Sequence, residues 1–147
     1  PLASSLRISP VPLTAYREGG RQGEIPGATG SFGWPVSSRR INQYYTRYHL
    51  GIDIDGDTGN PIYAADGGMV LRAGWWLGGF GNAVKIDHGN GYTTSYAHMS
   101  RILVSVGQKV ERGQVIGEIG STGRSTGSHV HLEVQKNGRR LNPLGVF

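Results

Sequence analysis

The sequence predicts a mainly β protein whose antiparallel sheets form a distorted sandwich or an open barrel, with a groove walled by loops. The first observation is composition: glycine is abundant, with 25 of 147 residues, while only 17% of the residues are charged. The second is pattern, because runs of about five to eight residues rich in β-branched and aromatic side chains alternate with glycine-rich turns. No long stretch shows the period of an amphipathic helix. Short strands joined by tight turns are typical of packed antiparallel sheets.

Residues 1–31 and residues 32–147 differ in character. The first segment is rich in proline, glycine and serine and has no sustained period, so we expect a linker or an N-terminal arm there. A disordered arm and an irregular arm packed over the domain both fit this composition. Large apolar residues return at Phe32 and Trp34. Residues 32–147 are then expected to form one domain, which is long enough for a hydrophobic core of its own.

The first strands of this domain follow one another from Ile41 onward. Residues 48–55 (YHLGIDID), 61–65 (PIYAA) and 68–74 (GMVLRAG) are candidate strands. Residues 74–82 (GWWLGGFGN) are expected to form a glycine-rich loop that carries three large aromatic side chains. Residues 83–88 form the next strand, and HGNG after it is a hairpin turn because its residues tolerate positive φ.

The remaining strands lead to the end of the chain. Residues 92–98 (YTTSYAH) form a strand that would place Tyr96 and His98 on one face. The stretch 106–120 (VGQKVERGQVIGEIG) predicts two small strands joined by turns. The loop 121–128 (STGRSTGS) leads into a strand with the sequence SHVHLE, and KNGR at 136–139 is its closing hairpin turn.

Two of these strands carry residues that can bind a metal. In SHVHLE, alternation puts His129, His131 and Glu133 on one face and apolar residues on the other. In YHLGIDID the same reasoning puts His49 and Asp53 on one face. Each motif alone is weak, because two-residue patterns arise often by chance. Together with a third strand-end histidine in the segment YAH, they indicate a zinc site or proton-transfer chemistry.

At these residues the chain resembles the lysostaphin-like (LytM-type) zinc metallopeptidases, which cleave peptidoglycan peptides. The resemblance rests on HLGID, YAHMS and STGRSTGSHVHLEV in this order and extends from about residue 33 to 143. It implies a mainly antiparallel β-fold with a groove floored by the sheet. It also implies a zinc-dependent endopeptidase that hydrolyses peptide bonds in peptidoglycan stem peptides or cross-bridges.

Matched motif by motif, the resemblance implies one zinc ion per chain, with His49, Asp53 and His131 as its ligands. It implies His98 and His129 as the catalytic histidines. Three protein ligands leave the fourth position of tetrahedral zinc for water, as a hydrolytic site requires. Two imidazoles that are not bound to the metal can take a proton from that water and return it to the departing amine.

Several residues near these motifs keep two interpretations. A tyrosine before the first ligand stabilises the oxyanion in parts of the family, but spacing does not select among Tyr44, Tyr45 and Tyr48, which can equally be packing residues. Glu133 can orient an imidazole or simply be solvated or salt-bridged. His88 begins a hairpin turn and is interpreted as structural. The aromatic residues of the 74–82 loop either line the substrate groove or pack on the sheet: Trp75, Trp76 and Phe80.

Other classes of function fit less well. DIDGDTGN from Asp53 lacks the glycine and glutamate that an EF-hand loop requires, and STGRSTG lacks the GK[ST] of a P-loop. A biotinyl, lipoyl or phosphoryl carrier resembles the 106–120 stretch but does not need Asp53 beside His49. A non-catalytic scaffold or activator domain of the same fold is the main alternative. Such domains typically lack one or more of the five site residues, and all five are present here.

The charge of the chain indicates its surroundings. The net charge is +5, which favours an anionic partner such as the cell envelope. The resemblance implies a peptidoglycan peptide as the substrate. Nucleic acid is not expected, because the basic residues are scattered and no nucleic-acid-binding motif accompanies them. Neither a transmembrane run nor a signal-peptide pattern is seen in this sequence. We expect a bacterial, extracytoplasmic monomer (periplasmic, wall-associated or secreted) whose export signal is not part of this chain.

Overall fold

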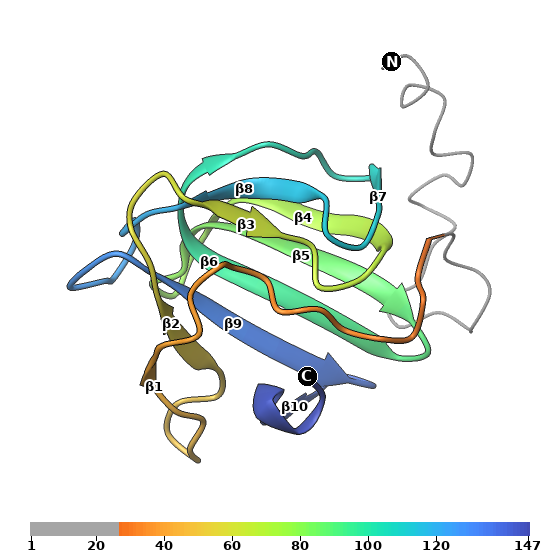
Figure 1. The fold of residues 1–147 in the computed structure, drawn as a ribbon, viewed down its shortest axis with the longest axis horizontal. Helices are drawn as coiled ribbons and strands as arrows, with labels where there is room; N and C mark the ends of the chain where they lie inside the picture. Colours follow the sequence, from red (N-terminus) through yellow and green to blue (C-terminus); the bar gives the residue numbers. More distant parts are fainter. Residues whose placement is uncertain (1–26) are drawn as a thin grey trace.

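The computed structural model describes residues 27–147, and within that range it contains one antiparallel sheet of ten strands and a short 3₁₀ helix (Figure 1). The elements follow in this order: β1 (Ile41–Gln43), β2 (Ile52–Asp55), β3 (Pro61–Tyr63), β4 (Gly68–Trp76), β5 (Gly81–Gly89), β6 (Tyr92–Ile102), β7 (Lys109–Val110), β8 (Val115–Ile119), β9 (His129–Lys136), β10 (Arg139–Leu141) and η2 (Pro143–Gly145). None of the described helices is long and apolar enough to cross a bilayer.

The sheet is built around its long central strands. Its order is β1-β2-β9-β6-β5-β4-β7, with β10 added beside β9 and with β8 pairing both β3 and β6. Every pairing is antiparallel, and the described strands do not close into a barrel. The predicted mainly β, antiparallel fold is therefore confirmed, and the expected sheets of a distorted sandwich or open barrel are one continuous sheet.

One face of the central strands carries the hydrophobic core. Ile52, Ile54 and Leu132 are fully buried there, together with Tyr96, whose hydroxyl accepts a hydrogen bond from the Ala65 N–H at 2.9 Å. Alternation along β2 and β9 produces this face, as the sequence predicts. The opposite face of the same strands is thus left for the polar side chains at the alternate positions.

The segment of residues 27–40 covers this core. Phe32 and Trp34 pack against it, and Val36 is buried within it. Two backbone hydrogen bonds attach the segment, from Gly33 N to Ala65 O and from Tyr63 N to Pro35 O, both 2.7 Å long. Most of the arm expected over residues 1–31 lies outside the described residues. Its described end, residues 27–31, is held to the domain by the Asp66 carboxylate, which accepts hydrogen bonds from Thr29 and Gly30.

Two hairpin turns confirm the turn chemistry expected from the sequence. Asn90 and Gly91 join β5 to β6 with φ values of 55° and 83°. Asn137 and Gly138 join β9 to β10 with φ values of 52° and 81°. Consecutive positive φ values match the right-handed twist of the flanking strands, which explains why Asn-Gly occupies both positions.

The structure corrects two predicted strand boundaries. β2 begins only at Ile52, so His49 and Leu50 are not in a regular strand; His49 instead forms an isolated bridge with Thr46, and Leu50 is 36% exposed. β4 continues through residues 74–76, which were predicted as part of a loop. Pairing of Trp75 with Asn82 on β5 extends the ladder there and leaves the Trp75 side chain 61% exposed.

A third correction concerns His98, which does not share a face with Tyr96. His98 has a φ of 63°, and the register between β5 and β6 shifts at this point, as in a β-bulge. Tyr96 and Met99 therefore both face the core, although they are three residues apart. The bulge turns His98 to the opposite face, toward His131.

Candidate metal centre

Four histidines and one aspartate surround a single cleft of about 310 Å³ on the face of the sheet opposite the core. Asp53 on β2 and His131 on β9 are direct cross-strand partners, and His129 lies two residues along β9 on the same face. His49 enters from the loop before β2, and His98 enters from the bulge of β6. The structure thus brings together all five residues that the sequence singled out.

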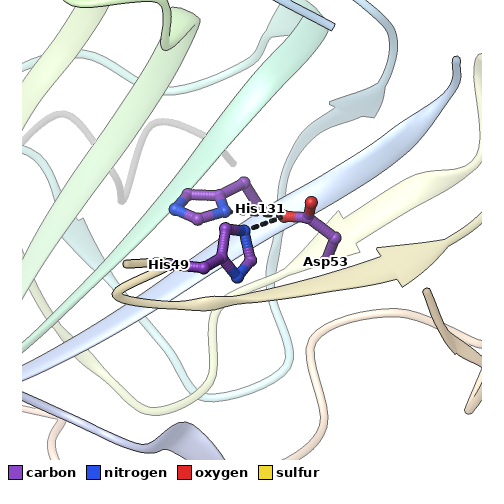
Figure 2. A group of neighbouring side chains, drawn as sticks. All are labelled: His49, Asp53 and His131. Carbon is purple, nitrogen blue, oxygen red and sulfur yellow. Dashed lines mark hydrogen bonds and ion pairs between the residues drawn. The ribbon is translucent and has the colours of Figure 1, made fainter. Parts of the chain in front are cut away.

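Three of these residues converge closely enough to hold one metal ion. One ligand atom from each of His49, Asp53 and His131 lies within 4.8 Å of the other two. Asp53 Oδ1 is 3.3 Å from His49 Nε2 and 2.6 Å from His131 Nδ1, and both interactions are drawn in Figure 2. Two imidazole nitrogens and one carboxylate oxygen form a donor set that zinc accepts.

Each imidazole of this trio uses its other ring nitrogen as an anchor. His49 Nδ1 donates to the backbone carbonyl of Tyr44 at 3.1 Å, which leaves Nε2 directed toward Asp53. His131 Nε2 donates to Glu133 Oε2 at 3.0 Å, which leaves Nδ1 toward Asp53. Outer acceptors of this kind fix the orientation of histidines that bind metals.

His98 and His129 are anchored in the same manner. His98 Nδ1 donates to the carbonyl of Thr122 at 2.8 Å, and His129 Nδ1 donates to that of Gly127 at 2.9 Å. The Nε2 atom of each ring remains available to the cleft. The two ring centroids are 4.7 Å apart, and His129 Nε2 lies 3.7 Å from Asp53 Oδ2. Two imidazoles beside a candidate metal site are suited to moving protons there.

His131, Asp53 and Glu133 shift one another's pKa values. Burial alone would lower the pKa of His131, but hydrogen bonds to Asp53 and Glu133 outweigh it and raise that pKa to about 9. Burial would raise the pKa values of Asp53 and Glu133, yet both are lowered, chiefly by their hydrogen bonds to His131. Without a metal, His131 is therefore an imidazolium held between two carboxylates. A cation placed between His131 and Asp53 would replace its proton.

His98 has the opposite tendency. Burial lowers the pKa of His98, and the positive charges of neighbouring imidazoles act in the same direction. The hydrogen bond from its Nδ1 to Thr122 only partly offsets this effect. Near neutral pH His98 is consequently uncharged, with the proton on Nδ1 and a free lone pair on Nε2.

Thr122 links the two loops that wall the cleft. Its Oγ1 donates to Met99 O at 2.7 Å and accepts from Asn82 N at 3.1 Å. A Cβ at Gly81 would stand 2.5 Å from the Thr122 carbonyl carbon, and the positive φ of 66° at Gly81 also disfavours other residues. The loop after β8 and the turn before β5 can approach this closely only because glycine lies between them.

A second close approach involves Gly51, between two candidate ligands in the sequence. A Cβ at Gly51 would stand 2.6 Å from Leu132 O and 2.8 Å from Cε1 of His131. Real Cβ atoms do not come this close to backbone oxygen, so any side chain here would displace β9 or the imidazole. The glycine of HLGID therefore has a steric role in positioning His131.

The structure decides several interpretations that the sequence left open. Glu133 is 6% exposed and accepts hydrogen bonds from both His131 and Arg140 Nε, each 3.0 Å long, so it is a buried anchor and not a solvated side chain. His88 is buried elsewhere, between Gly67 O and Thr94 Oγ1, which agrees with a structural role. Trp76 is buried and stacks with Phe80, which itself contacts the His131 ring.

The three tyrosines before the first candidate ligand have different surroundings. Tyr45 donates its hydroxyl to Arg140 O at 3.3 Å and packs against the core. Tyr44 and Tyr48 have exposed side chains, and Tyr44 contributes its backbone carbonyl to His49. That carbonyl, like those of Thr122 and Gly127, has no signal in the sequence because every residue has one.

Comparison with known proteins finds similarity over most of the chain. Residues 47–143 match Peptidase family M23. The chain is 41% identical over 119 residues to a "Lipoprotein NlpD/LppB homolog" of Pseudomonas aeruginosa, covering 80% of the chain and 40% of the relative. It is 43% identical over 118 residues to the peptidoglycan DD-endopeptidase ShyA of Vibrio cholerae, covering 76% of the chain and 27% of the relative. The chain thus spans less than half the length of these relatives.

Solved structures show the same similarity in three dimensions. A zinc-containing peptidase from Vibrio cholerae superposes with a TM-score of 0.71 at 32% identity, over 78% of this chain and 39% of that one. The antimicrobial peptidase lysostaphin from Staphylococcus simulans superposes with a TM-score of 0.69 at 30% identity, over 80% of this chain and 53% of that one.

Proposed function

The chain belongs to peptidase family M23, and on that premise we propose that it is a zinc-dependent endopeptidase that hydrolyses peptide bonds in peptidoglycan. One observation carries the proposal: four imidazoles, each anchored by one ring nitrogen, present the other nitrogen to the cleft around Asp53. Imidazoles that are fixed through one ring nitrogen and direct the other into the cleft are the preorganised groups that a hydrolytic metal site needs.

We propose one zinc ion per chain, held by His49, Asp53 and His131. The donor set supports this assignment, and so does similarity to a zinc-containing peptidase. Zinc bound there would polarise a peptide carbonyl and increase the acidity of a water molecule. The alternative partner for the His131–Asp53 pair is a proton, so metal and proton compete for the same position.

His98 and His129 are proposed to move the protons of the reaction. His98 has a lowered pKa, so its Nε2 can accept a proton from the attacking water near neutral pH. The His129 ring lies 4.7 Å from that of His98, centroid to centroid, and its Nε2 is 3.7 Å from Asp53 Oδ2, whose negative charge would stabilise a proton on the ring during the reaction. Once protonated, this pair can donate to the nitrogen of the departing amine, which completes the hydrolysis.

The proposed substrate is a peptide of the bacterial cell wall. ShyA is named as a peptidoglycan DD-endopeptidase, and this relationship favours a bond between D-amino acids in the cross-link. The net charge of +5 favours an anionic envelope. One relative is named as a lipoprotein homolog, which supports an extracytoplasmic location. Mass spectrometry of products released from peptidoglycan of known cross-link chemistry would identify the scissile bond.

The test combines zinc analysis with turnover of purified peptidoglycan. Wild-type protein should contain one zinc ion and release peptides. His129→Ala should retain zinc and lose cleavage, because His129 is not a proposed ligand, whereas His131→Ala should lose both. His88→Gln is the matched control: it removes an imidazole at a buried position outside the cleft, so zinc content and cleavage should persist in the folded protein.

Each other outcome has a defined meaning. Zinc loss in His129→Ala with zinc retention in His131→Ala would show that the two roles are exchanged. Wild-type protein that binds zinc but leaves every peptidoglycan intact would favour the alternative of a non-catalytic scaffold or activator domain. The convergence of all five residues argues against that alternative, because a scaffold needs neither the metal trio nor the second pair of imidazoles.

A further inference from the structure

A second cleft, of about 400 Å³, lies beside the candidate metal centre. We call it the basic groove; its lining includes Arg72, Trp76, Lys85, Ser95, Gln135 and Arg140. Phe80 lines both clefts, and Glu133 of the groove is hydrogen-bonded to His131. The two clefts are therefore neighbouring parts of one surface.

Strand register explains how these residues come together. Arg72, Lys85, Ser95 and Glu133 are successive cross-strand partners on β4, β5, β6 and β9, so they form one line across the sheet. His131 lies two residues from Glu133 along β9 and therefore belongs to the next line on the same face. Ala97, the partner of His131 on β6, has a small buried side chain, so no large side chain rises from the sheet beside His131 at this point.

The groove carries an excess of positive charge. Among the described residues, three basic side chains line it, from β4, β5 and β10, against one carboxylate, that of Glu133. Glu133 is already engaged, because it accepts from Arg140 Nε and from His131 Nε2. Arg140 is neutralised in the same ion pair, so an anion in the groove would meet chiefly Arg72.

Arg72 is held in a defined position within this field. Its guanidinium carbon lies 4.1 Å from the centroid of the Trp76 ring, and stacking on indole leaves the N–H edge of the guanidinium free to meet a carboxylate. Trp76 is fixed in turn by stacking on Phe80, with ring centroids 5.4 Å apart. Trp75 and Leu77 beside it are 61% and 88% exposed and add apolar surface.

The distance from the metal centre suits a peptide. Three interstrand steps of ~4.8 Å and a two-residue step of ~7 Å place the Cα of Arg72 roughly 16 Å from that of His131. An extended peptide covers about 3.4 Å per residue, so about four or five residues would span this distance, and fewer when the long arginine side chain reaches back. The groove lies within the reach of one short substrate peptide.

We propose that the basic groove binds a free carboxylate of the peptide substrate, on one side of the bond to be cleaved, with Arg72 as the principal contact. The proposal rests on the proposed function, because it takes the substrate to be a peptide that crosses the metal centre. A peptide can carry a free carboxylate or the corresponding uncharged carboxamide. Charge at this position would make the protein distinguish the two forms.

A binding experiment tests the groove without requiring catalysis. Two fluorescent cross-linked peptides are compared, one with free carboxylates and one with the same groups as carboxamides, in chelator-treated protein by fluorescence anisotropy. Wild type should bind the carboxylate form about tenfold more tightly, the value of one charge-assisted contact. Arg72→Gln should reduce this preference to about twofold or less. Arg101→Gln removes the same charge from an exposed position outside the groove and should keep the full preference.

The outcomes distinguish failure of the groove proposal from failure of the proposed function. Equal binding of both peptides, no binding of either, or an unchanged preference in Arg72→Gln would overturn the groove proposal. Hydrolysis of both peptides by the zinc-loaded protein without preference would overturn it too, while leaving the proposed function intact. A carboxylate preference that Arg72→Gln abolishes, in a zinc-loaded protein that cleaves neither peptide, would support the groove and count against the proposed function.

Discussion

Zinc binding should expel a proton from His131. In the metal-free protein this imidazole is an imidazolium between Asp53 and Glu133, with its pKa raised from 6.5 to about 9. Its Nδ1 proton occupies the position that a metal between His131 and Asp53 needs. Because a metal ligand must be deprotonated, binding and proton release are linked. At pH 8, a group with a pKa of about 9 is about nine-tenths protonated, whereas an ordinary histidine is almost entirely neutral.

The magnitude follows from the distance between pH and pKa. The apparent zinc affinity should be lowered about tenfold at pH 8 and about 100-fold at pH 7, relative to its value above pH 9. The raised pKa of His131 also makes the stability of the metal-free protein depend on pH. A folded pKa above the unfolded value stabilises the metal-free protein below pH 6.5, and this contribution is lost as pH rises to about 9. The full shift corresponds to about 3 kcal/mol.

Two measurements check this prediction. Calorimetry of zinc binding at pH 8, in buffers with different enthalpies of ionisation, gives the number of protons released, and about 0.9 is expected from His131. Nuclear magnetic resonance of the metal-free protein should show the ring nitrogens of His131 titrating with a midpoint near 9. Glu133→Gln is the matched control, because it keeps Asp53 but removes one of the two carboxylates that raise the pKa of His131.

The control also accounts for protons that come from other groups. Any proton released by a group bound to the metal other than His131 is released equally in wild type and in Glu133→Gln. The difference in proton release between the two proteins therefore comes from His131. We expect Glu133→Gln to release clearly fewer protons at pH 8. A midpoint near 6.5 for His131 in the metal-free protein would refute the reasoning, since it would mean that the two carboxylates do not hold the imidazole in its charged form.

Three further substitutions test how the site is positioned. Gly51→Ala should lower zinc affinity at least about tenfold in a zinc titration without removing a ligand, because its Cβ would meet His131; unchanged affinity would contradict this. Thr122→Val should lower the rate of peptide cleavage about tenfold while zinc stays bound, since it frees the loop whose carbonyl orients His98, and a wild-type rate would argue against that role. Leu132→Ala should cost about 2–5 kcal/mol of unfolding free energy in urea, and a loss below 1 kcal/mol would mean that the core there collapses around the gap.

Strand alternation predicted the site well where the strands are regular. On β9 it correctly put His129 and His131 on one face with Val130 and Leu132 buried on the other. On β6 it failed at His98, because a residue with positive φ interrupts the alternation and no pattern in YAH signals the bulge. His49 was predicted to lie within a strand, but that strand begins at Ile52, three residues after His49.

Other parts of the site depend on tertiary structure alone. The carbonyls of Tyr44, Thr122 and Gly127 orient three imidazoles, but carbonyl groups are common to all residues. The basic groove combines side chains from β4, β5 and β10, which are distant in the sequence and meet only through strand pairing. Residue types can be recognised from sequence motifs, whereas hydrogen-bond partners require the fold.

The pairing of β2 with β9 has a further consequence for folding. Asp53 and Asp55 face His131 and His129, so a slip of two residues would still set a carboxylate against an imidazole and an isoleucine beside an apolar neighbour. Local contacts between these two strands therefore discriminate poorly between the native register and its neighbour. β9 also pairs with β6 through six residue pairs, from Tyr92↔Lys136 to Ala97↔His131, and these have no such internal repeat. We therefore expect the register between β9 and β6 to be set independently of β2, so that β2 aligns on a strand whose own register is already fixed.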